Sequence, residues 1–312
     1  MNKKEKTKQF NINPVEKVMI DIGNSVFKLS YKDSMFQFDS KIKKINANTM
    51  DFQEAIIYNN ECYAISQGDY VHDNFKAEKE GLEQFIFYGL STIFPDRDNI
   101  TVNLMLNLPV DQLANKDLLK SRLKNSYEFI INSPQNNIKN KKRFLTINKI
   151  GVVAESVASY YSLGNELEDF ITILDIGSKT TNFATFTNVG INDIDKTGTL
   201  NIGIHNLYQD LVQYYKTTNH ITYKTQDIDI RLRKNRLEIP LDIKKNFIDQ
   251  IKNGLYEKGF TDYDGYMIKA CGGGSLVLGT DLETAFSNCS ILDNALFRNA
   301  IGSKLISEQL GF

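Results

Sequence analysis

The tripeptide Asp-Ile-Gly occurs twice in this chain of 312 residues, at 21–23 and again at 175–177. Each copy follows an apolar run, opens a polar turn and leads into a second strand-like run, which is the pattern of a β-hairpin. The copies lie 175 − 21 = 154 residues apart, about half the length of the chain. Such a repeat favours a duplicated architecture of two similar lobes.

The composition restricts the class of protein. With 41% apolar and 24% charged residues, the chain is typical of a soluble globular protein, and its length suits two domains. A formal net charge of −1 argues against extensive direct contact with nucleic acid or with an anionic membrane. Three scattered cysteines argue against disulfides and fit a cytoplasmic location. No apolar run has the length of a membrane span, and the polar residues 1–14 are expected to form a mobile tail.

Apolar periodicity along the chain predicts an α/β fold with sheets that are only partly parallel. Strand pairs are expected at 18–31, 55–65 and 171–186, and single strands at 99–107, 144–147 and 266–270. Helices are expected at 80–94, 116–130, 152–163, 204–215, 241–258 and 293–310. The polar stretch 219–234 is expected to be an exposed excursion.

The acidic residue that ends the first strand of each hairpin suits a site for Mg²⁺ and a nucleotide. Mg²⁺ keeps several waters and is commonly held by one or two carboxylates together with phosphate oxygens. Asp21 and Asp175 are the candidates, and Gly23 and Gly177 permit close approach of a phosphate. Taken alone, such a tripeptide is more often an ordinary turn, so this interpretation depends on the two matched copies. The other polar residues of the two turns expected to contact phosphate are Asn24, Ser25, Lys28, Ser178, Lys179, Thr180 and Thr181.

Three consecutive glycines, Gly272, Gly273 and Gly274, lie between an expected strand and an expected helix. Bare backbone at that position lets a nucleotide approach the free N–H groups of the helix. A tight connection between strand and helix explains the same glycines equally well when they are considered alone.

These segments, in this order, resemble the actin, hexokinase and heat-shock chaperone superfamily of nucleotide-binding folds. Five of them carry the resemblance: a first phosphate motif at 21–28, a first connecting helix at 153–158, a second phosphate motif at 175–181, an adenosine motif at 270–274 and a second connecting segment at 297–302.

Within the superfamily, residues 104–110 and 201–208 resemble bacterial plasmid-segregating actin-like proteins of the ParM type. The chain departs from that family at Asn107, where Gly is common, and at Ser178-Lys179, which is bulkier than the family's turn. The resemblance implies two lobes, each a mixed sheet with flanking helices, and a nucleotide in the cleft between them. Their expected ranges are 15–160 for lobe I, 161–292 for lobe II and 293–312 for a C-terminal helical segment that returns towards lobe I.

The resemblance also implies roles for individual residues. In such folds a polar residue at the start of the connecting helix positions water near the γ-phosphate, and Glu155 has that place. A carboxylate on a helix is normally just solvated, but the neighbours of Glu155 are small and apolar. Glu155, Asp21 and Asp175 are therefore the predicted catalytic residues, and the two aspartates are predicted to hold Mg²⁺ through water. Gly203 and Asn299 are predicted to contact the nucleotide, expected to be ATP, with GTP not excluded.

Three functions are compatible with this fold. The first is an ATP hydrolase that forms head-to-tail filaments and segregates plasmid DNA through a DNA-binding adaptor, without a membrane partner. The second is a sugar or acyl-metabolite kinase, for which Asp111 is a weak candidate as the base that activates the acceptor. The third is a nucleotide-sensing scaffold with little turnover.

Overall fold

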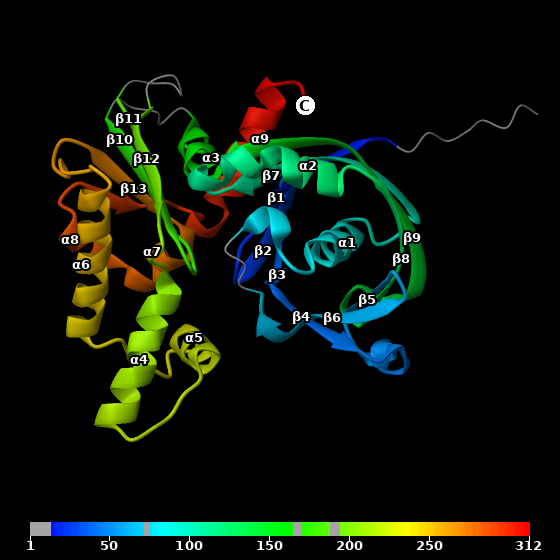
Figure 1. Ribbon diagram of the computed structural model, residues 1–312, viewed down its shortest axis with the longest axis horizontal. Helices are drawn as coiled ribbons and strands as arrows, with labels where there is room; N and C mark the ends of the chain where they lie inside the picture. The colour runs from blue at the N-terminus through cyan, green and yellow to red at the C-terminus, as the bar shows by residue number, and fades with distance from the viewer. Residues whose placement is uncertain (1–13, 72–74, 165–169, 188–193) are drawn as a thin grey trace, which may run out of the picture.

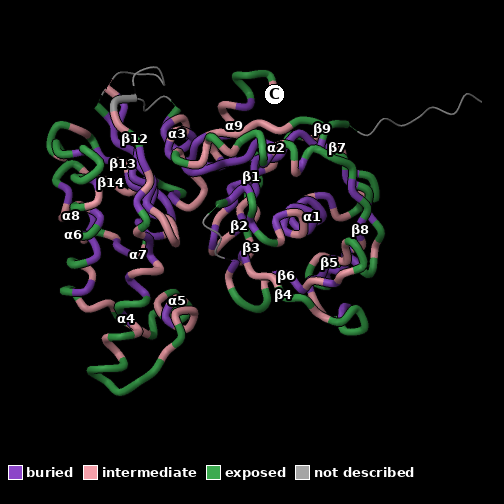
Figure 2. The backbone as a smooth tube through the Cα atoms, in the orientation of Figure 1, coloured by how far each residue is buried: buried purple, intermediate pink, exposed green. Residues whose placement is uncertain are grey.

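The computed structural model describes residues 14–71, 75–164, 170–187 and 194–312. Almost all of the expected N-terminal tail thus lies outside the described residues. Two separate sheets lie side by side, each with its own helices (Figure 1). Buried backbone is concentrated in α1 (Leu82–Ile93) and in the central strands of both sheets, whereas the segment between α4 and α5 is exposed (Figure 2). None of the helices among the described residues is long and apolar enough to cross a bilayer.

The first sheet has nine strands in the order β3-β2-β1-β7-β9-β8-β5-β6-β4. It curls around α1, whose residues are buried on nearly all sides (Figure 1). Pairing is parallel between β1 and β7 and between β7 and β9, and antiparallel elsewhere. The strands are β1 (Glu16–Asp21), β2 (Val26–Tyr31), β3 (Ser34–Asp39), β4 (Lys41–Ile45), β5 (Ala55–Tyr58), β6 (Glu61–Tyr70), β7 (Asn99–Leu108), β8 (Ser126–Ser133) and β9 (Ile138–Ala154).

The second sheet has five strands in the order β12-β11-β10-β13-β14. The helix α6 packs on it through Ile243, Phe247, Ile251 and Leu255, the four-residue stripe visible in the sequence. The strands are β10 (Ile171–Ile176), β11 (Thr181–Phe186), β12 (Ile194–Leu200), β13 (Met267–Cys271) and β14 (Cys289–Ile291). The helices that follow β12 are α4 (Ile204–Thr218), α5 (Thr225–Arg233), α6 (Leu241–Glu257), α7 (Gly272–Leu278) and α8 (Thr280–Ala285).

Two helices, α3 (Glu155–Tyr161) and α9 (Arg298–Gln309), cross where the sheets meet (Figure 1). Their backbones touch, since a Cβ on Gly302 would lie 1.6 Å from the carbonyl oxygen of Ala158. The helix α9 also contacts β1, β2 and β7, and Asn107 at the end of β7 donates a hydrogen bond to Ser303 at 2.8 Å. The polar residue at position 107 thus anchors the last helix.

Three expected elements differ from the structure. The helix expected at 116–130 is α2 (Lys116–Leu123) followed by β8, because burial beyond Leu123 alternates with a period of two. The strand at 144–147 is part of the much longer β9, so the helix expected from 152 begins only at Glu155. The polar excursion at 219–234 contains α5, which inserts the fully buried Ile228 into the core of the second sheet.

Candidate functional site

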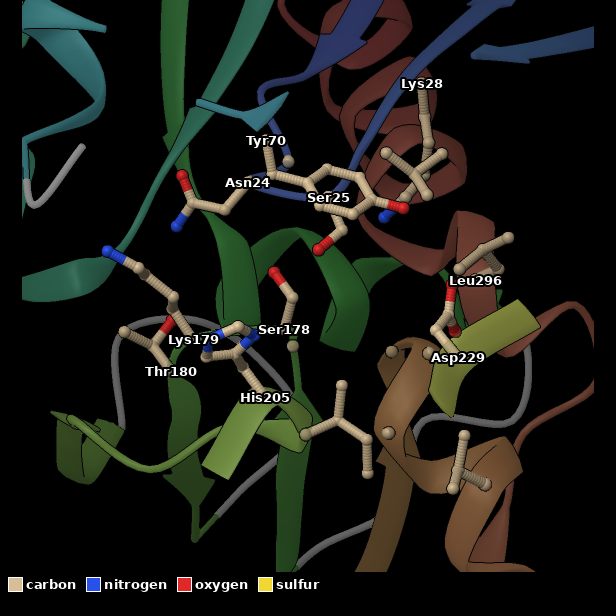
Figure 3. A pocket seen from close by; sticks show the side chains of 18 of the residues that line it. Asn24, Ser25, Lys28, Tyr70, Ser178, Lys179, Thr180, His205, Asp229 and Leu296 are labelled. Atoms are coloured by element: carbon tan, nitrogen blue, oxygen red, sulfur yellow. The ribbon is translucent and has the colours of Figure 1, made fainter. Parts of the chain in front are cut away.

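A cavity of about 600 Å³ lies between the two halves of the molecule. Its walls come from the β1–β2 turn, the β10–β11 turn, the start of α7, α4 and α5, and Figure 3 shows side chains from both halves pointing into it. Most of the site residues predicted from the sequence line it: Asp21, Gly23, Asn24, Ser25, Lys28, Glu155, Asp175, Gly177, Ser178, Lys179, Thr180, Gly272, Gly273, Gly274 and Asn299.

Two predicted residues, Thr181 and Gly203, lie behind this wall. The buried hydroxyl of Thr181 donates to the carbonyl oxygen of Ile202 at 2.7 Å. A Cβ on Gly203 would come within 2.4 to 2.6 Å of the backbone of Ser178 and Lys179. In the structure both residues therefore shape the second turn.

The first hairpin holds a buried ion pair. Asp21 is 3% exposed and lies opposite Lys28 in the β1–β2 register, so the Lys28 ammonium donates to its carboxylate at 2.7 Å. The turn itself requires glycine, because a Cβ on Gly23 would lie 2.0 Å from the Val26 carbonyl oxygen. The side-chain oxygen of Asn24 is buried at the cavity wall and has no hydrogen-bond partner among the described residues, which suits a bound group that donates.

The second hairpin repeats the backbone geometry, but the side chain opposite its aspartate is neutral. Asp175 lies opposite Asn182, and its carboxylate accepts a hydrogen bond at 2.7 Å from Asn299 on α9. The Asn182 amide instead donates to Glu155 at 2.7 Å. The backbone N–H of Gly177 closes the turn by donating to the Thr180 carbonyl oxygen at 2.8 Å.

Glu155 opens α3 and is held from both halves of the molecule. It is 3% exposed and accepts from Asn182 on β11 and from the ammonium of Lys76, which lies on a short 3₁₀ turn (Lys76–Glu78). Lys76 and Asn182 were not predicted as site residues. Nothing in the residues around Lys76 distinguishes it from a solvated lysine, whereas Asn182 was detectable as the counterpart of Lys28 seven residues after the aspartate.

The buried charges at the base of the cavity shift one another's pKa values. Burial raises the pKa of Glu155 to about 7, helped by repulsion from Asp21 and Asp175 and opposed by Lys76. Burial likewise raises the pKa of Asp175. For Asp21, burial is outweighed by the attraction of Lys28 and Lys76, so its pKa is lowered. Three carboxylates face two ammonium groups here, an excess of negative charge that can bind a cation.

The three glycines that begin α7 line the cavity. Gly272 has φ of +82°, and a Cβ there would lie 2.4 Å from Asp175 Oδ1 and from the Ile176 carbonyl oxygen. A Cβ on Gly274 would lie 2.3 Å from the Ile176 side chain. Gly273 is different, since its nearest such neighbour is Leu296 at 3.6 Å. The first and third glycines are therefore needed for packing, whereas a Cβ on the middle one would make an ordinary van der Waals contact.

At the mouth of the cavity α5 approaches β6. Gln226 on α5 donates a hydrogen bond to Asp69 on β6 at 3.3 Å, and Tyr208 on α4 donates to Asp229 at 3.1 Å. His205 also lines the cavity. Burial and the nearby Lys179 lower the pKa of His205, and this lower pKa favours the neutral imidazole. Polar groups therefore surround the mouth as well as the base.

The donor set fits Mg²⁺ held mainly through water. Among the described residues, no group of three or more histidine, cysteine, aspartate or glutamate side chains is placed to bind a metal ion by itself. Asp21 and Asp175 nevertheless face one cavity with an excess of carboxylates. That arrangement suits an ion that keeps several waters and completes its shell with phosphate oxygens.

No protein-family model matches the sequence, and neither does any curated protein. Solved structures are nevertheless similar in three dimensions. An archaeal actin homologue matches with a TM-score of 0.78 and 16% identity over 95% of this chain and 100% of that chain. A ParM filament from Clostridium botulinum matches with a TM-score of 0.77 and 17% identity over 95% and 99%. The AlfA filament bound to AMPPNP matches with a TM-score of 0.60 and 20% identity over 95% and 98%.

Identities this low establish the fold alone. They confirm the fold expected from the sequence, a mixed α/β architecture with two sheets and flanking helices. The chain has the two-lobed fold of actin-like proteins, with Asp21, Glu155 and Asp175 around the cavity between its lobes.

Proposed function

We propose that this chain is an Mg²⁺-dependent ATP hydrolase that assembles into nucleotide-dependent filaments. The observation that carries the proposal is the meeting of Glu155, Asp21 and Asp175 in one cavity, beside two glycine turns and an open backbone segment. The fold supports it, because structures with the same fold include an archaeal actin homologue in complex with ADP and the AlfA filament bound to AMPPNP. We keep 160/161 and 292/293 as the proposed boundaries of the lobes.

The proposed role of Glu155 follows from how it is held. Hydrolysis of a phosphoanhydride requires a water in line with the bond that breaks and donors for the charge that develops. Contacts from Asn182 and Lys76 fix the Glu155 carboxylate at the cavity base, where it orients the water. A pKa of about 7 suits a group that accepts the water's proton near neutral pH.

The remaining charges are assigned to the phosphates and the metal. The ammonium groups of Lys28 and Lys76 stabilise negative charge on phosphate oxygens. Asp21 and Asp175 would hold Mg²⁺ through its waters, and the bound ion supplies charge neutralisation on the phosphates.

Assembly and its purpose are the second half of the proposal. Copies that add head to tail through contacts that do not close a ring form a helical filament. A net charge of −1 favours an indirect link to DNA, so we propose a DNA-binding adaptor at a centromere-like plasmid site, in the cytoplasm. A small-molecule kinase gains no support from Asp111, which is exposed on the 3₁₀ turn Val110–Asn115 and does not line the cavity.

One experiment tests the proposal. Purified protein is mixed with Mg-ATP, Mg-GTP, Mg-AMPPNP or ATP with EDTA, and light scattering, sedimentation and phosphate release are followed across protein concentrations. We expect assembly above a critical concentration with Mg-ATP, more persistent assembly with Mg-AMPPNP and none with EDTA. Phosphate transfer to a sugar or acyl metabolite, without nucleotide-dependent assembly, would contradict it.

A further inference from the structure

A second cavity of about 320 Å³ lies inside the nine-stranded sheet, away from the base of the first. The sheet curls so far that its edge strand β3 comes near β6, but β3 pairs only with β2 in the strand order. The lining of the cavity comes from β3, from β6 and from the second half of α1, among other segments. Its lining includes Phe36, Phe38, Glu54, Tyr88 and Asn136.

The cavity contains a buried carboxylate that no cation neutralises. Glu54 is 9% exposed and accepts hydrogen bonds from the Tyr88 hydroxyl at 3.0 Å, the Ser133 hydroxyl and the Gln135 backbone N–H at 3.0 Å. All three donors are neutral, and no lysine, arginine or histidine in the described part of the chain forms an ion pair with Glu54. The buried charged pairs of the first cavity, by contrast, each contain an ammonium group. A buried carboxylate without a counterion can bind a cation from outside.

Aromatic rings form the wall beside this carboxylate. Phe38 packs edge-on against Tyr88, with ring centroids 4.9 Å apart, and it stacks on Phe27 at 5.3 Å. No cation of the described residues lies over Phe36, Phe38 or Tyr88. Apolar rings next to a carboxylate suit an organic ammonium ion, because the anion attracts the positive charge and the rings can pack against its alkyl part.

From this arrangement we propose that the second cavity is a binding site for a small organic ammonium ion. The ammonium group pairs with Glu54, which still has lone pairs beyond its three hydrogen bonds, and the alkyl part lies against Phe36 and Phe38. The volume suits a ligand of a few carbon atoms.

The site lies directly behind the strand that faces the first cavity. Side chains alternate along β3, so Phe36 and Phe38 face α1 while Gln37 lies in register with Lys28, which pairs with Asp21. Gln37 lines both cavities. A ligand that contacts β3 in the second cavity would therefore also affect the position of the β2–β3 pair, which carries Lys28 on its opposite face.

The test compares butane-1,4-diamine with butane-1,4-diol, which has a similar size but no charge. Binding to the full chain without nucleotide is measured by titration calorimetry at constant ionic strength, and the ligand is located by soaking it into crystals. We expect saturable binding of the diamine with one copy per chain, at least tenfold weaker binding of the diol, and density beside Glu54. Equal binding of the two, or no saturable binding of the diamine, would overturn the proposal without any variant.

A variant removes the charge and keeps the shape. In Glu54→Gln the amide retains one acceptor for Gln135, and the hydroxyls of Tyr88 and Ser133 can reorient as acceptors. Diamine affinity should fall at least tenfold, whereas Glu128→Gln, which changes an exposed carboxylate on β8, should leave it unchanged. Unchanged affinity in a folded Glu54→Gln variant would contradict the assignment. A second probe is lysine acetylated at its α-nitrogen and amidated with methylamine, which keeps a free ε-ammonium group. If this probe binds more tightly than the diamine, the ligand is a lysine side chain of a protein; if it binds more weakly, the ligand is a free amine.

Discussion

The β1–β2 and β10–β11 hairpins have the same backbone arrangement but carry their charges differently. In the first, an aspartate is the last residue of the first strand, and in the second it is the last but one. In both, the residue seven positions later lies opposite the aspartate in the register. Lys28 has that place in the first hairpin and pairs with Asp21, whereas Asn182 has it in the second and donates to Glu155 instead. Asp175 is left with a neutral amide from Asn299.

The difference suggests a division of labour within a duplicated frame. The first carboxylate pairs directly with an ammonium group that also faces the cavity. The second carboxylate is bonded to the neutral Asn299 amide, and burial raises its pKa. The second aspartate is therefore better suited to attract a hydrated cation, and the first hairpin to attract phosphate. Identical tripeptides in the sequence do not imply identical roles.

The largest effect is expected from removing the residue opposite each aspartate. Lys28→Asn leaves the buried Asp21 without its cation, which should lower the free energy of unfolding by about 3–5 kcal/mol. Asn182→Ala removes a neutral donor from Glu155 and should cost about 1–3 kcal/mol. Urea unfolding of both variants measures the difference, and equal losses would mean that the two hairpins are equivalent in charge.

The next effect concerns the carboxylate that the second hairpin holds. Glu155→Gln or Glu155→Ala should slow phosphate release by about 10²–10³-fold while nucleotide binding is retained, because the water loses its orienting base. Single-turnover phosphate release measures the rate, and filaments should persist longer in sedimentation assays. The exposed Glu128→Gln is the matched control. Turnover equal to that of the parent would remove Glu155 from the catalytic role.

A smaller effect separates the glycines of the two turns. A Cβ on Gly23 would lie 2.0 Å from the Val26 carbonyl oxygen, whereas a Cβ on Gly177 would lie 3.0 Å from the Thr180 carbonyl oxygen. Gly23→Ala should therefore destabilise by about 1–3 kcal/mol, and Gly177→Ala by less than about 1 kcal/mol. Thermal and urea unfolding provide the measurement. A larger loss for Gly177→Ala would show that the second turn is the tighter one.

The last test is the pH dependence of stability, in which the two aspartates should act with opposite signs. The pKa of Asp21 is lowered from 3.8, so its contribution is present above that value and is lost as pH falls. Folding raises the pKa of Asp175, and it raises the pKa of Glu155 from 4.5 to about 7. Each of these groups therefore binds a proton more tightly in the folded state than in the unfolded state, so its contribution to stability declines as pH rises. For Glu155 the decline falls between about pH 4.5 and 7. Asp21→Asn should reduce the loss of unfolding free energy at low pH. Asp175→Asn and Glu155→Gln should each reduce the decline in unfolding free energy as pH rises towards neutral. Unfolding free energies from about pH 2 to 8 measure these slopes, and a common sign for both aspartates would contradict the charge assignment.

Local patterns in the sequence were sufficient for several elements, among them the two turns that face the cavity. Both hairpins, the glycine run that begins α7 and the stripe of α6 follow from short-range patterns, and the structure has them at the expected positions. Residues that meet over long distances were not predictable in this way. Lys76 reaches Glu155 across 79 positions of the chain, and no local signal marks that pairing.

The incorrect elements have a related cause. Leu119 and Leu123 fit a helix, and Tyr127 and Ile130 continue that spacing, but β8 gains its stability from pairing with β5 and β9, which lie elsewhere in the chain. The helix α5 was missed because its composition is mostly polar and only Ile228 is buried. Its place at the cavity mouth depends on tertiary packing rather than on its own periodicity.

The contact between α3 and α9 determines how the halves of the molecule can move. The chain passes from one sheet to the other through α3 and returns through the segment before α9, so two neighbouring connections join the halves. Two rigid bodies joined by two neighbouring connections can rotate about the line through those connections, as at a hinge, and resist sliding past each other. Because Gly302 and Ala158 meet backbone to backbone, α3 and α9 cannot move closer together at this point. The helix α5 and the strand β6 lie at the end of the molecule opposite α3 and α9, so a small rotation about α3 and α9 displaces them most (Figure 1). The hydrogen bond from Gln226 on α5 to Asp69 on β6 is therefore the contact most sensitive to that rotation.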